Sequence, residues 1–303
     1  MRIGLIAQLH GRPGSKLNPS WRSIRELATT AEGVGFDMFV FEDALMYRYD
    51  DHTDGCWESM TMAGAIGAST DRIHFGQSVV NAPYRSPAMT ASMAETLANI
   101  SDGRYVLGIG AGNTFVSDYE GFGFPTDKRY SRFAEAIKII HTLLRTGSVD
   151  FEGEFYTTRG AELMLRGPSP TGPPINIAAG GPRMLRLVAR YADEWNWWTW
   201  DETIPEAIER LTPIVEDLER ACEESGRDPS TLGRTIDLYS ITPPGMNPET
   251  SMTNPIRGTA DEIASHILAL GQLGVDEVRC DLTDKSRAAV EAMAPIVDAV
   301  HAA

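Results

Sequence analysis

Short apolar runs alternate with amphipathic stretches along this chain, and this alternation restricts the possible folds more than any other feature. The apolar runs predict strands at Arg2–Gln8, Met38–Asp43, Arg72–Val79, Tyr105–Ala111, Ile175–Ala179, Glu194–Trp200, Thr235–Ser240 and Glu277–Leu282. The amphipathic stretches predict helices at Pro19–Gly33, Glu58–Ser69, Pro87–Ile100, Arg129–Thr146, Pro182–Ala192, Pro205–Ser225, Thr259–Leu273 and Lys285–His301. This order predicts an α/β fold with a parallel sheet, closed into a (β/α)₈ barrel of the TIM type. A doubly wound open sheet is the alternative.

Long connections interrupt the alternation at a few points. Gly112–Lys128 follows the fourth strand, a Pro- and Gly-rich loop up to Pro255 follows the seventh, and an excursion with a hairpin at Val149–Thr157 precedes the fifth. No repeat, low-complexity tract or linker divides the chain. We therefore expect residues 1–303 to form a single barrel domain.

Charge and cysteine content argue against several functions. The net charge of −15 provides no basic face, so we expect no binding to nucleic acid or to an anionic membrane. Cys56, Cys222 and Cys280 form no spacing typical of a zinc site or a disulfide framework, which predicts no metal and fits a reducing cytoplasm. The N-terminus enters a strand at once, and no apolar run reaches the ~18 residues of a membrane span, so we expect neither a signal peptide nor a transmembrane helix.

The active site of such a barrel lies at the C-terminal ends of its strands. The most informative stretch there is Ala178-Ala179-Gly180-Gly181-Pro182-Arg183, between the fifth strand and the next helix. Small residues let a ligand approach the backbone, the start of a helix offers free N–H groups, and Arg183 adds a positive charge. The stretch predicts a phosphate-binding site, with a tight turn that binds no ligand as the alternative.

Glycines also end the fourth strand, in the sequence Gly108-Ile-Gly-Ala-Gly112. A dinucleotide-binding fingerprint requires a helix that begins at the last glycine. Here a long loop with several aromatic residues follows instead, so we reject a dinucleotide site. We expect these small residues to make room for a flat ring.

Polar residues at strand ends are candidates for proton transfer. Glu42 and Asp43 end the second strand, where they would orient a ligand or exchange a proton. An ion pair with a neighbouring strand is the alternative for one of them. His10 and Asn113 lie on the same expected face, although a loop histidine is more often simply solvated. The aromatic residues of Trp195–Trp200 suit stacking on a flat ring.

Taken in order along the chain, the motifs resemble those of the luciferase-like monooxygenase superfamily. They look most like its single-domain members, which use reduced coenzyme F420 (a deazaflavin) or FMN. The resemblance covers nearly the whole chain and rests on Gly76–Asn81, Tyr84–Pro87, Ser101–Gly112, Phe122–Pro125, Arg132–Ala136, Phe151–Tyr156, Ile177–Met184 and Tyr191–Asp193. No single motif is decisive, but the ordered set is specific.

The resemblance implies roles for matching positions. Asp43 would hydrogen-bond the cofactor ring, and Ser78 and Val79 would form a bulge behind the ring, often with a non-proline cis peptide bond. The cofactor-binding residues that it implies are Asp43, Ser78, Val79, Asn81, Ala178, Ala179, Gly180, Gly181, Pro182, Arg183 and Thr199.

One position departs from the family pattern. Many relatives carry a histidine directly after the acid of the second strand, where it exchanges a proton with the substrate; here that position is Ala44. The residues that are candidates to replace it are Glu42, His10, His52 and Asn113. The predicted catalytic residues are Asp43, Glu42, His10 and Asn113.

The leading hypothesis is an oxidoreductase that uses F420 or FMN to transfer hydride to a small organic substrate or to oxygenate it. The Ala-Ala-Gly-Gly-Pro stretch favours F420 slightly. The alternatives are a monooxygenase restricted to FMNH2 and O2, and a flavin-binding protein without activity, which the absence of histidine at Ala44 suggests. A lyase or aldolase ranks last because the strand ends offer no lysine and no metal cluster. A flavin or F420 reductase and a second copy in a homodimer are the expected partners.

Overall fold

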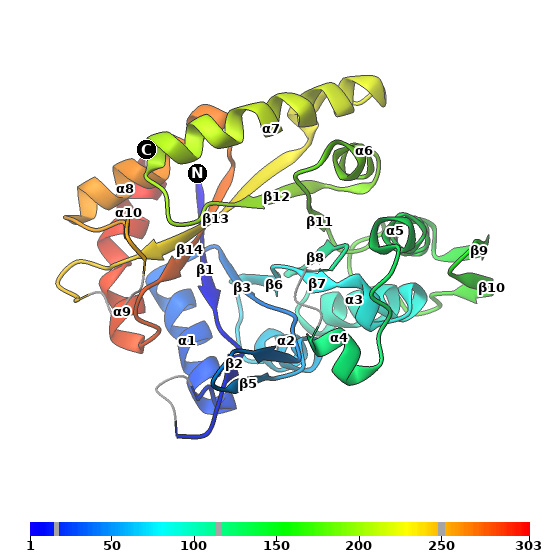
Figure 1. Ribbon diagram of the computed structural model, residues 1–303, viewed down its shortest axis with the longest axis horizontal. Coiled ribbons are helices and arrows are strands. Elements are labelled where there is room, and N and C mark those ends of the chain that lie inside the picture. The colour runs from blue at the N-terminus through cyan, green and yellow to red at the C-terminus, as the bar shows by residue number, and fades with distance from the viewer. Residues whose placement is uncertain (15–17, 113–116, 248–251) are drawn as a thin grey trace.

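The computed structural model describes residues 1–14, 18–112, 117–247 and 252–303. Within these ranges, eight parallel strands close into a barrel with helices around the outside (Figure 1). In the order in which neighbours pair, the strands are β1 (Arg2–Ala7), β3 (Met38–Phe41), β6 (His74–Gln77), β8 (Tyr105–Gly110), β11 (Ile175–Ala178), β12 (Glu194–Trp198), β13 (Gly233–Ile241) and β14 (Glu277–Leu282). Because β8 pairs with β11 and β14 returns to β1, the sheet closes. The predicted (β/α)₈ barrel is confirmed and the open sheet is excluded.

The helices alternate with these strands. They are α1 (Trp21–Val34), α2 (Ser59–Gly67), α3 (Pro87–Ile100), α4 (Ser117–Phe122), α5 (Arg129–Thr146), α6 (Pro182–Tyr191), α7 (Ile204–Glu224), α8 (Ala260–Ala269), α9 (Arg287–Ala292) and α10 (Ala294–Ala302), with short 3₁₀ helices η1 (Ala82–Tyr84), η2 (Pro229–Thr231) and η3 (Leu270–Leu273). Within the described ranges, none of them combines the length and the apolar composition needed to cross a bilayer.

Local signals explain where several helices begin and end. Helices α3 and α5 have the predicted bounds, and Gly147 ends α5 in the left-handed conformation with φ 84°. Thr259 and Glu262 form the predicted capping box of α8. The last predicted helix is wrong in one respect: it divides at Met293 into α9 and α10. Pro295 lies in the first turn of α10 and provides no N–H to continue the preceding helix.

A small antiparallel sheet that the sequence did not predict lies beside the barrel. It consists of β2 (His10–Gly11), β5 (Thr53–Cys56) and β4 (Met46–Arg48), in this order. Strands this short carry no readable alternation of apolar and polar residues, so only tertiary pairing reveals them. The predicted hairpin is confirmed as β9 (Ser148–Glu152) and β10 (Thr157–Glu162), which project beyond α5 (Figure 1).

Charged side chains fill part of the barrel interior. Arg279 of β14 is fully buried and donates to Glu277 at 2.5 Å. Its other guanidinium nitrogens lie 3.8 Å from Glu194 of β12 and 3.9 Å from Asp237 of β13. Carboxylates on β12, β13 and β14 itself thereby compensate a cation that would be very costly to bury alone.

Glu32 of α1 holds the turn before β6. Its carboxylate accepts hydrogen bonds from the backbone N–H groups of Asp71, Arg72 and Ile73 at 2.9, 2.7 and 3.0 Å. Burial raises the pKa of Glu32, but the three N–H groups outweigh burial and hold the pKa below its ordinary value of 4.5. A carboxyl with a lowered folded-state pKa contributes stability above its unfolded pKa, and this stability is lost as the pH falls through the folded pKa.

We therefore expect Glu32→Gln to lower the free energy of unfolding at neutral pH, and to have a much smaller effect at an acidic pH below the lowered folded-state pKa, where wild-type Glu32 is also protonated. Urea unfolding of both proteins at the two pH values measures this difference. Glu26 on the same helix faces Arg287 at 3.3 Å, and Glu26→Gln is the matched control. An effect of Glu32→Gln that is equal at both pH values would contradict the assignment.

Candidate active site

The N-terminus of α6 offers unpaired donors to an anion. Gly181 is the N-cap and Pro182 the first helical residue, no side chain caps the helix, and its first turn holds no acidic residue. The N–H groups of Gly180, Gly181 and Arg183 have no hydrogen-bond partner among the described residues. A β-carbon on Gly181 would meet nothing within 4 Å. Free amides, the positive end of the helix dipole and open space together suit a phosphate group.

The residues just before this helix are engaged within the barrel. The N–H of Ala179 donates to the carbonyl of Asn196 at 3.2 Å, and its carbonyl accepts the indole N–H of Trp195 at 2.6 Å. A β-carbon on Gly180 would lie 2.3 Å from ring atoms of Trp197. The amide of Ala179 is therefore occupied, and the free donors of the predicted cradle begin at Gly180. Position 180 requires glycine because the indole of Trp197 packs against its backbone.

Arg183 is exposed beside the same helix terminus. Its guanidinium lies 3.8 Å from the centre of the Tyr130 ring of α5. This cation–π contact keeps a positive charge between α5 and α6. The position of Arg183 beside the helix terminus leaves its charge available to an anion there, and this role stays a prediction. Ala178 ends β11 and is half-buried.

The glycines at the end of β8 are surrounded by protein. A β-carbon would lie 1.9 Å from the carbonyl oxygen of Gln77 at Gly108, 2.9 Å from the side chain of Val79 at Gly110, and 2.4 Å from the hydroxyl of Tyr119 at Gly112. The space that we expected beside them for a flat ring is filled by β6, by the segment after it, and by α4. This expectation is therefore corrected: the glycines allow close approach of the backbone.

The segment that fills this space contains the cis peptide bond that the resemblance implies, between Ser78 and Val79. It joins β6 to the short strand β7 (Val80–Asn81), which pairs with β8. The Ser78 hydroxyl donates to Asp237 of β13 at 2.7 Å, and Asn196 donates to the other oxygen of Asp237 at 3.0 Å. Burial raises the pKa of Asp237 despite these bonds. A buried carboxylate thereby links the bulge to the opposite side of the barrel.

Asp43 lies at the centre of a buried network. Its carboxylate accepts from the Ser59 hydroxyl at 2.7 Å, from the Asn81 N–H at 2.9 Å and from two nitrogens of Arg85 at 2.7 and 3.0 Å. Arg85 also pairs with Glu58. Four donors saturate a carboxylate. Asp43 is therefore part of an ion pair, but its partner Arg85 follows η1 and does not lie on a neighbouring strand as the alternative expected. The hydrogen bond to a cofactor ring that the resemblance implies for Asp43 stays a prediction.

Asn81, another predicted cofactor ligand, is bound to the same network. Its side-chain amide donates to the backbone carbonyl of Asp43, and its oxygen accepts the Tyr119 hydroxyl at 3.0 Å. The strand end, the bulge and α4 are thereby joined by polar contacts. Any role of Asn81 toward a cofactor depends on this support.

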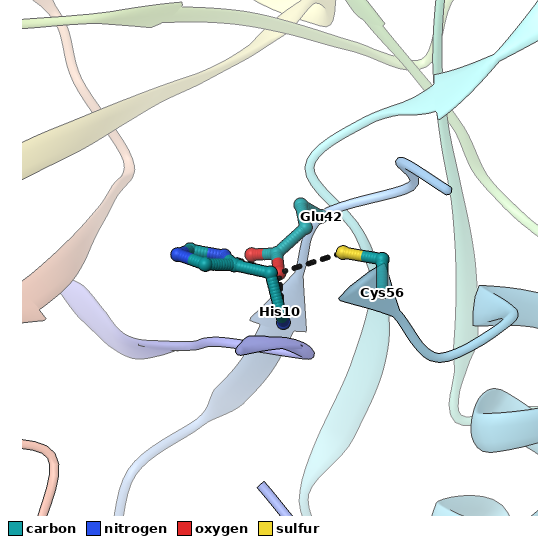
Figure 2. Close-up of side chains that lie close together, drawn as sticks. All are labelled: His10, Glu42 and Cys56. Carbon is teal, nitrogen blue, oxygen red and sulfur yellow. Dashed lines mark hydrogen bonds and ion pairs between the residues drawn. The ribbon is translucent and has the colours of Figure 1, made fainter. Parts of the chain in front are cut away.

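Glu42 and His10 form a second polar group at the barrel end. Nδ1 of His10 lies 2.9 Å from Oε1 of Glu42, and the thiol of Cys56 donates to the same oxygen (Figure 2). This oxygen also accepts the backbone N–H groups of Leu9 and His10. Burial lowers the pKa of His10, but the hydrogen bond to Glu42 and its charge outweigh burial and raise it. Burial raises the pKa of Glu42, but the hydrogen bond and charge of His10 and the N–H of Leu9 outweigh burial and hold the pKa below its ordinary value. The pair therefore favours an imidazolium facing a carboxylate, and Nε2 of His10 has no partner among the described residues.

Two other predicted residues, Thr199 and Asn113, are not part of these polar groups. Thr199 is buried, and its hydroxyl accepts the N–H of Tyr239 at 3.3 Å; its cofactor role stays a prediction. Asn113 lies outside the described residues. Sequence reasoning missed Arg85 and Asp237. The signal for Asp237 is an acid placed between the apolar residues Ile236 and Leu238 of a predicted strand. Arg85 lies in a motif that the resemblance had already singled out.

Comparison with known proteins identifies relatives over most of the chain. The luciferase-like monooxygenase family model matches residues 1–243. The F420-dependent glucose-6-phosphate dehydrogenase of Mycolicibacterium gilvum is 30% identical over 252 residues, which are 80% of this chain and 72% of that protein. The corresponding protein of Nakamurella multipartita is 37% identical over 174 residues, which are 56% of this chain and only 50% of that protein.

Solved structures share the fold at low sequence identity. An F420-dependent secondary alcohol dehydrogenase in complex with an F420–acetone adduct has a TM-score of 0.81 at 20% identity, covering 99% of this chain and 98% of that one. The coenzyme F420-dependent tetrahydromethanopterin reductase of Methanopyrus kandleri has a TM-score of 0.76 at 19% identity, covering 97% of both chains. Together with the extent of the family match, these similarities lead to one conclusion: the chain belongs to the luciferase-like monooxygenase family.

Proposed function

We propose that this protein is an oxidoreductase that uses coenzyme F420 to transfer hydride to or from a small organic alcohol or carbonyl compound. The observation that carries the proposal is the N-terminus of α6, with unpaired amides at Gly180, Gly181 and Arg183 and no acidic residue in its first turn. The relatives named as F420-dependent dehydrogenases support the choice of cofactor. The chemistry that F420 supplies when bound is hydride transfer.

The residues present fit an anionic cofactor. In the proposal, the amides of Gly180, Gly181 and Arg183 hold a phosphate group, with Pro182 beginning the helix behind it and Ala178 and Ala179 forming the approach. Across the barrel end, Ser78, Val79, Asn81 and Thr199 provide the remaining wall in the proposal. Asp43, whose side chain is completely covered, supports this wall from behind through its hydrogen bond with the N–H of Asn81. The stacked rings of Trp197 and Trp198, 3.9 Å apart, narrow the space for a substrate.

The substrate side needs a group that exchanges a proton. Oxidation of an alcohol to a carbonyl removes a hydride from carbon and a proton from oxygen, and reduction requires the reverse. We assign this proton to Nε2 of His10, with Glu42 orienting the ring and stabilising its charged form through the 2.9 Å hydrogen bond. A raised pKa of His10 favours the protonated ring, which suits proton donation during carbonyl reduction. A homodimer and a separate F420 reductase remain predictions.

Titration of the purified protein with F420 and with FMN, followed by quenching of tryptophan fluorescence, tests the proposal. We expect F420 to bind below ~100 μM and FMN to bind more weakly. Preference for FMN together with O2 consumption would favour the monooxygenase alternative. Binding of F420 without turnover of any alcohol or carbonyl compound would favour the protein without activity, and binding of neither cofactor would overturn the proposal.

Gly181→Asp tests the phosphate site without harming the fold. Gly181 is an N-cap with φ −100° and ψ 149°, a conformation in which aspartate caps a helix well. The new carboxylate would accept the N–H of Arg183, one of the three groups proposed for the phosphate, and would repel the phosphate charge. We expect the affinity for F420 to fall about 100-fold while the free energy of unfolding stays the same or rises by up to ~1 kcal/mol.

Gly181→Ala is the matched control, because it adds a methyl group in open space and no charge. We expect its affinity for F420 to fall much less than that of Gly181→Asp. Gly180 is unsuitable for this test, since any side chain there collides with Trp197. Unchanged F420 binding by a folded Gly181→Asp variant would contradict the proposed phosphate site.

A further inference from the structure

Three side chains of the types that bind transition metals meet at the barrel end. They are His10 of β2, Glu42 directly after β3, and Cys56 at the end of β5. One ligand atom from each lies within 4.8 Å of the other two. Figure 2 shows the imidazole and the thiol pointing toward the same carboxylate from opposite sides. Their positions in the sequence form no metal-binding spacing, so only the fold brings them together.

The backbone holds these positions before any ion binds. His10 and Cys56 are directly opposite each other in the antiparallel pair β2–β5. The Cys56 N–H donates to the carbonyl of Leu45 at 3.0 Å, which anchors the end of β5. The N–H groups of Leu9 and His10 fix Glu42 at 2.7 and 2.9 Å. Such supporting hydrogen bonds orient the ligands of metal sites and are part of how those sites select their ion.

The present contacts are those that a cation would replace. Nδ1 of His10 and the thiol of Cys56 lie 2.9 and 3.5 Å from the same oxygen of Glu42. The hydrogen-bonding protons of these two groups therefore lie in the space that a metal ion would take. A metal ion placed there would displace the thiol proton of Cys56 and the Nδ1 proton of His10. It would then bind the thiolate, Nδ1 and the carboxylate at about 2.0–2.3 Å after small side-chain movements. The second oxygen of Glu42 has no partner among the described residues and is also available.

We propose that His10, Glu42 and Cys56 bind a divalent transition-metal ion of the zinc type, with a fourth position open to water or to an oxygen of the substrate. One sulfur, one nitrogen and one oxygen ligand suit zinc, whereas Mg²⁺ and Ca²⁺ require oxygen ligands. The three side chains are partly buried, so they differ from exposed acidic groups that attract ions only loosely. The inference does not rest on F420. A bound ion would occupy the space of the proton between His10 and Glu42, so the metal-bound state and the imidazolium–carboxylate pair exclude each other. In the metal-bound state the ion, and not the protonated ring, would polarise a substrate oxygen.

Co²⁺ is the probe, because its spectrum reports both geometry and sulfur ligation. We expect the full-length protein, first stripped with a chelator, to bind one Co²⁺ with the visible bands of tetrahedral cobalt and a thiolate-to-cobalt charge-transfer band. Zn²⁺ should displace the Co²⁺ and abolish both. Cys56→Ser should remove the charge-transfer band, and both Cys56→Ser and His10→Gln should weaken Co²⁺ binding at least ~10-fold.

His52→Ala is the matched control. His52 lies in the loop between β4 and β5, 2.6 Å from Asp51 and 3.9 Å from Asp54, and is a competing place for an ion. We expect this variant to bind Co²⁺ as the wild type does. Thermal unfolding without metal checks that all variants fold.

Several results would overturn the metal site. They are no saturable Co²⁺ binding below ~100 μM, a charge-transfer band that survives in Cys56→Ser, or loss of binding in His52→Ala instead. Each of these outcomes is independent of the F420 titration, so failure of the metal site and failure of the proposed function can be told apart.

Discussion

Replacing Gly108 with alanine is expected to prevent correct closure of the barrel. The new β-carbon would lie 1.9 Å from the carbonyl oxygen and 3.1 Å from the carbonyl carbon of Gln77. These are backbone atoms of the neighbouring strand, so no side-chain rotation relieves the collision, and β6 and β8 must separate. We expect Gly108→Ala to lower the free energy of unfolding by at least ~3 kcal/mol, beyond the usual range for an added methyl group. Denaturant unfolding of the purified protein measures this loss.

Gly55→Ala is the matched control for this substitution. Gly55 also lies in a strand, β5, but a β-carbon there would meet nothing within 4 Å. We expect its stability to stay within about 0.5 kcal/mol of the wild type. Equal stability of the Gly108→Ala and Gly55→Ala proteins would contradict the close approach of the Gln77 backbone to position 108.

Replacing Arg85 with methionine should have the second large effect. The side chain of Asp43 is completely covered and that of Arg85 is only 10% exposed, so the pair is held away from water. Burial lowers the pKa of Arg85, but its bonds to Asp43 and Glu58 outweigh burial and raise it. Loss of the guanidinium leaves the carboxylate of Asp43 with two donors fewer and no counter-charge. We expect the free energy of unfolding to fall by about 3–5 kcal/mol.

A double-mutant cycle separates this ion pair from general packing. Asp43→Asn in the Arg85→Met background removes the uncompensated charge, so the double variant should recover part of the lost stability. Glu58→Gln is the control for the other contact of Arg85, and because Glu58 is 41% exposed we expect a small effect. Strictly additive losses in the cycle would contradict a direct coupling between Arg85 and Asp43.

The barrel was predictable because its signals are local and repeated. Helix α5 needed only its apolar spacing and the glycine that follows, and its bounds are as expected. The two residues of β2 carry no such pattern, and their pairing with β5 depends on contacts between distant segments. The contact of Cys56 with His10 was therefore hidden, and with it the cluster of metal-binding side chains.

The glycines show a second limit of sequence reasoning. Gly108 lies within β8, while Gly180 and Gly181 lie between β11 and α6, and the sequence predicted room for a ligand at all three. The structure shows three different surroundings for a β-carbon at these positions. It would meet the backbone of Gln77 at Gly108, the indole of Trp197 at Gly180, and only open space at Gly181. A sequence indicates that a β-carbon is missing, but the neighbours that require its absence are set by the fold.

The packing of Trp197 against Gly180 constrains how this family member can change over generations. The indole fills the volume of a β-carbon at position 180, since the two would lie 2.3 Å apart. A larger residue at position 180 becomes tolerable only after Trp197 has been exchanged for something smaller, because the two substitutions are not independent. If two related proteins differ at both positions, we therefore expect the substitution of Trp197 to have preceded the substitution of Gly180.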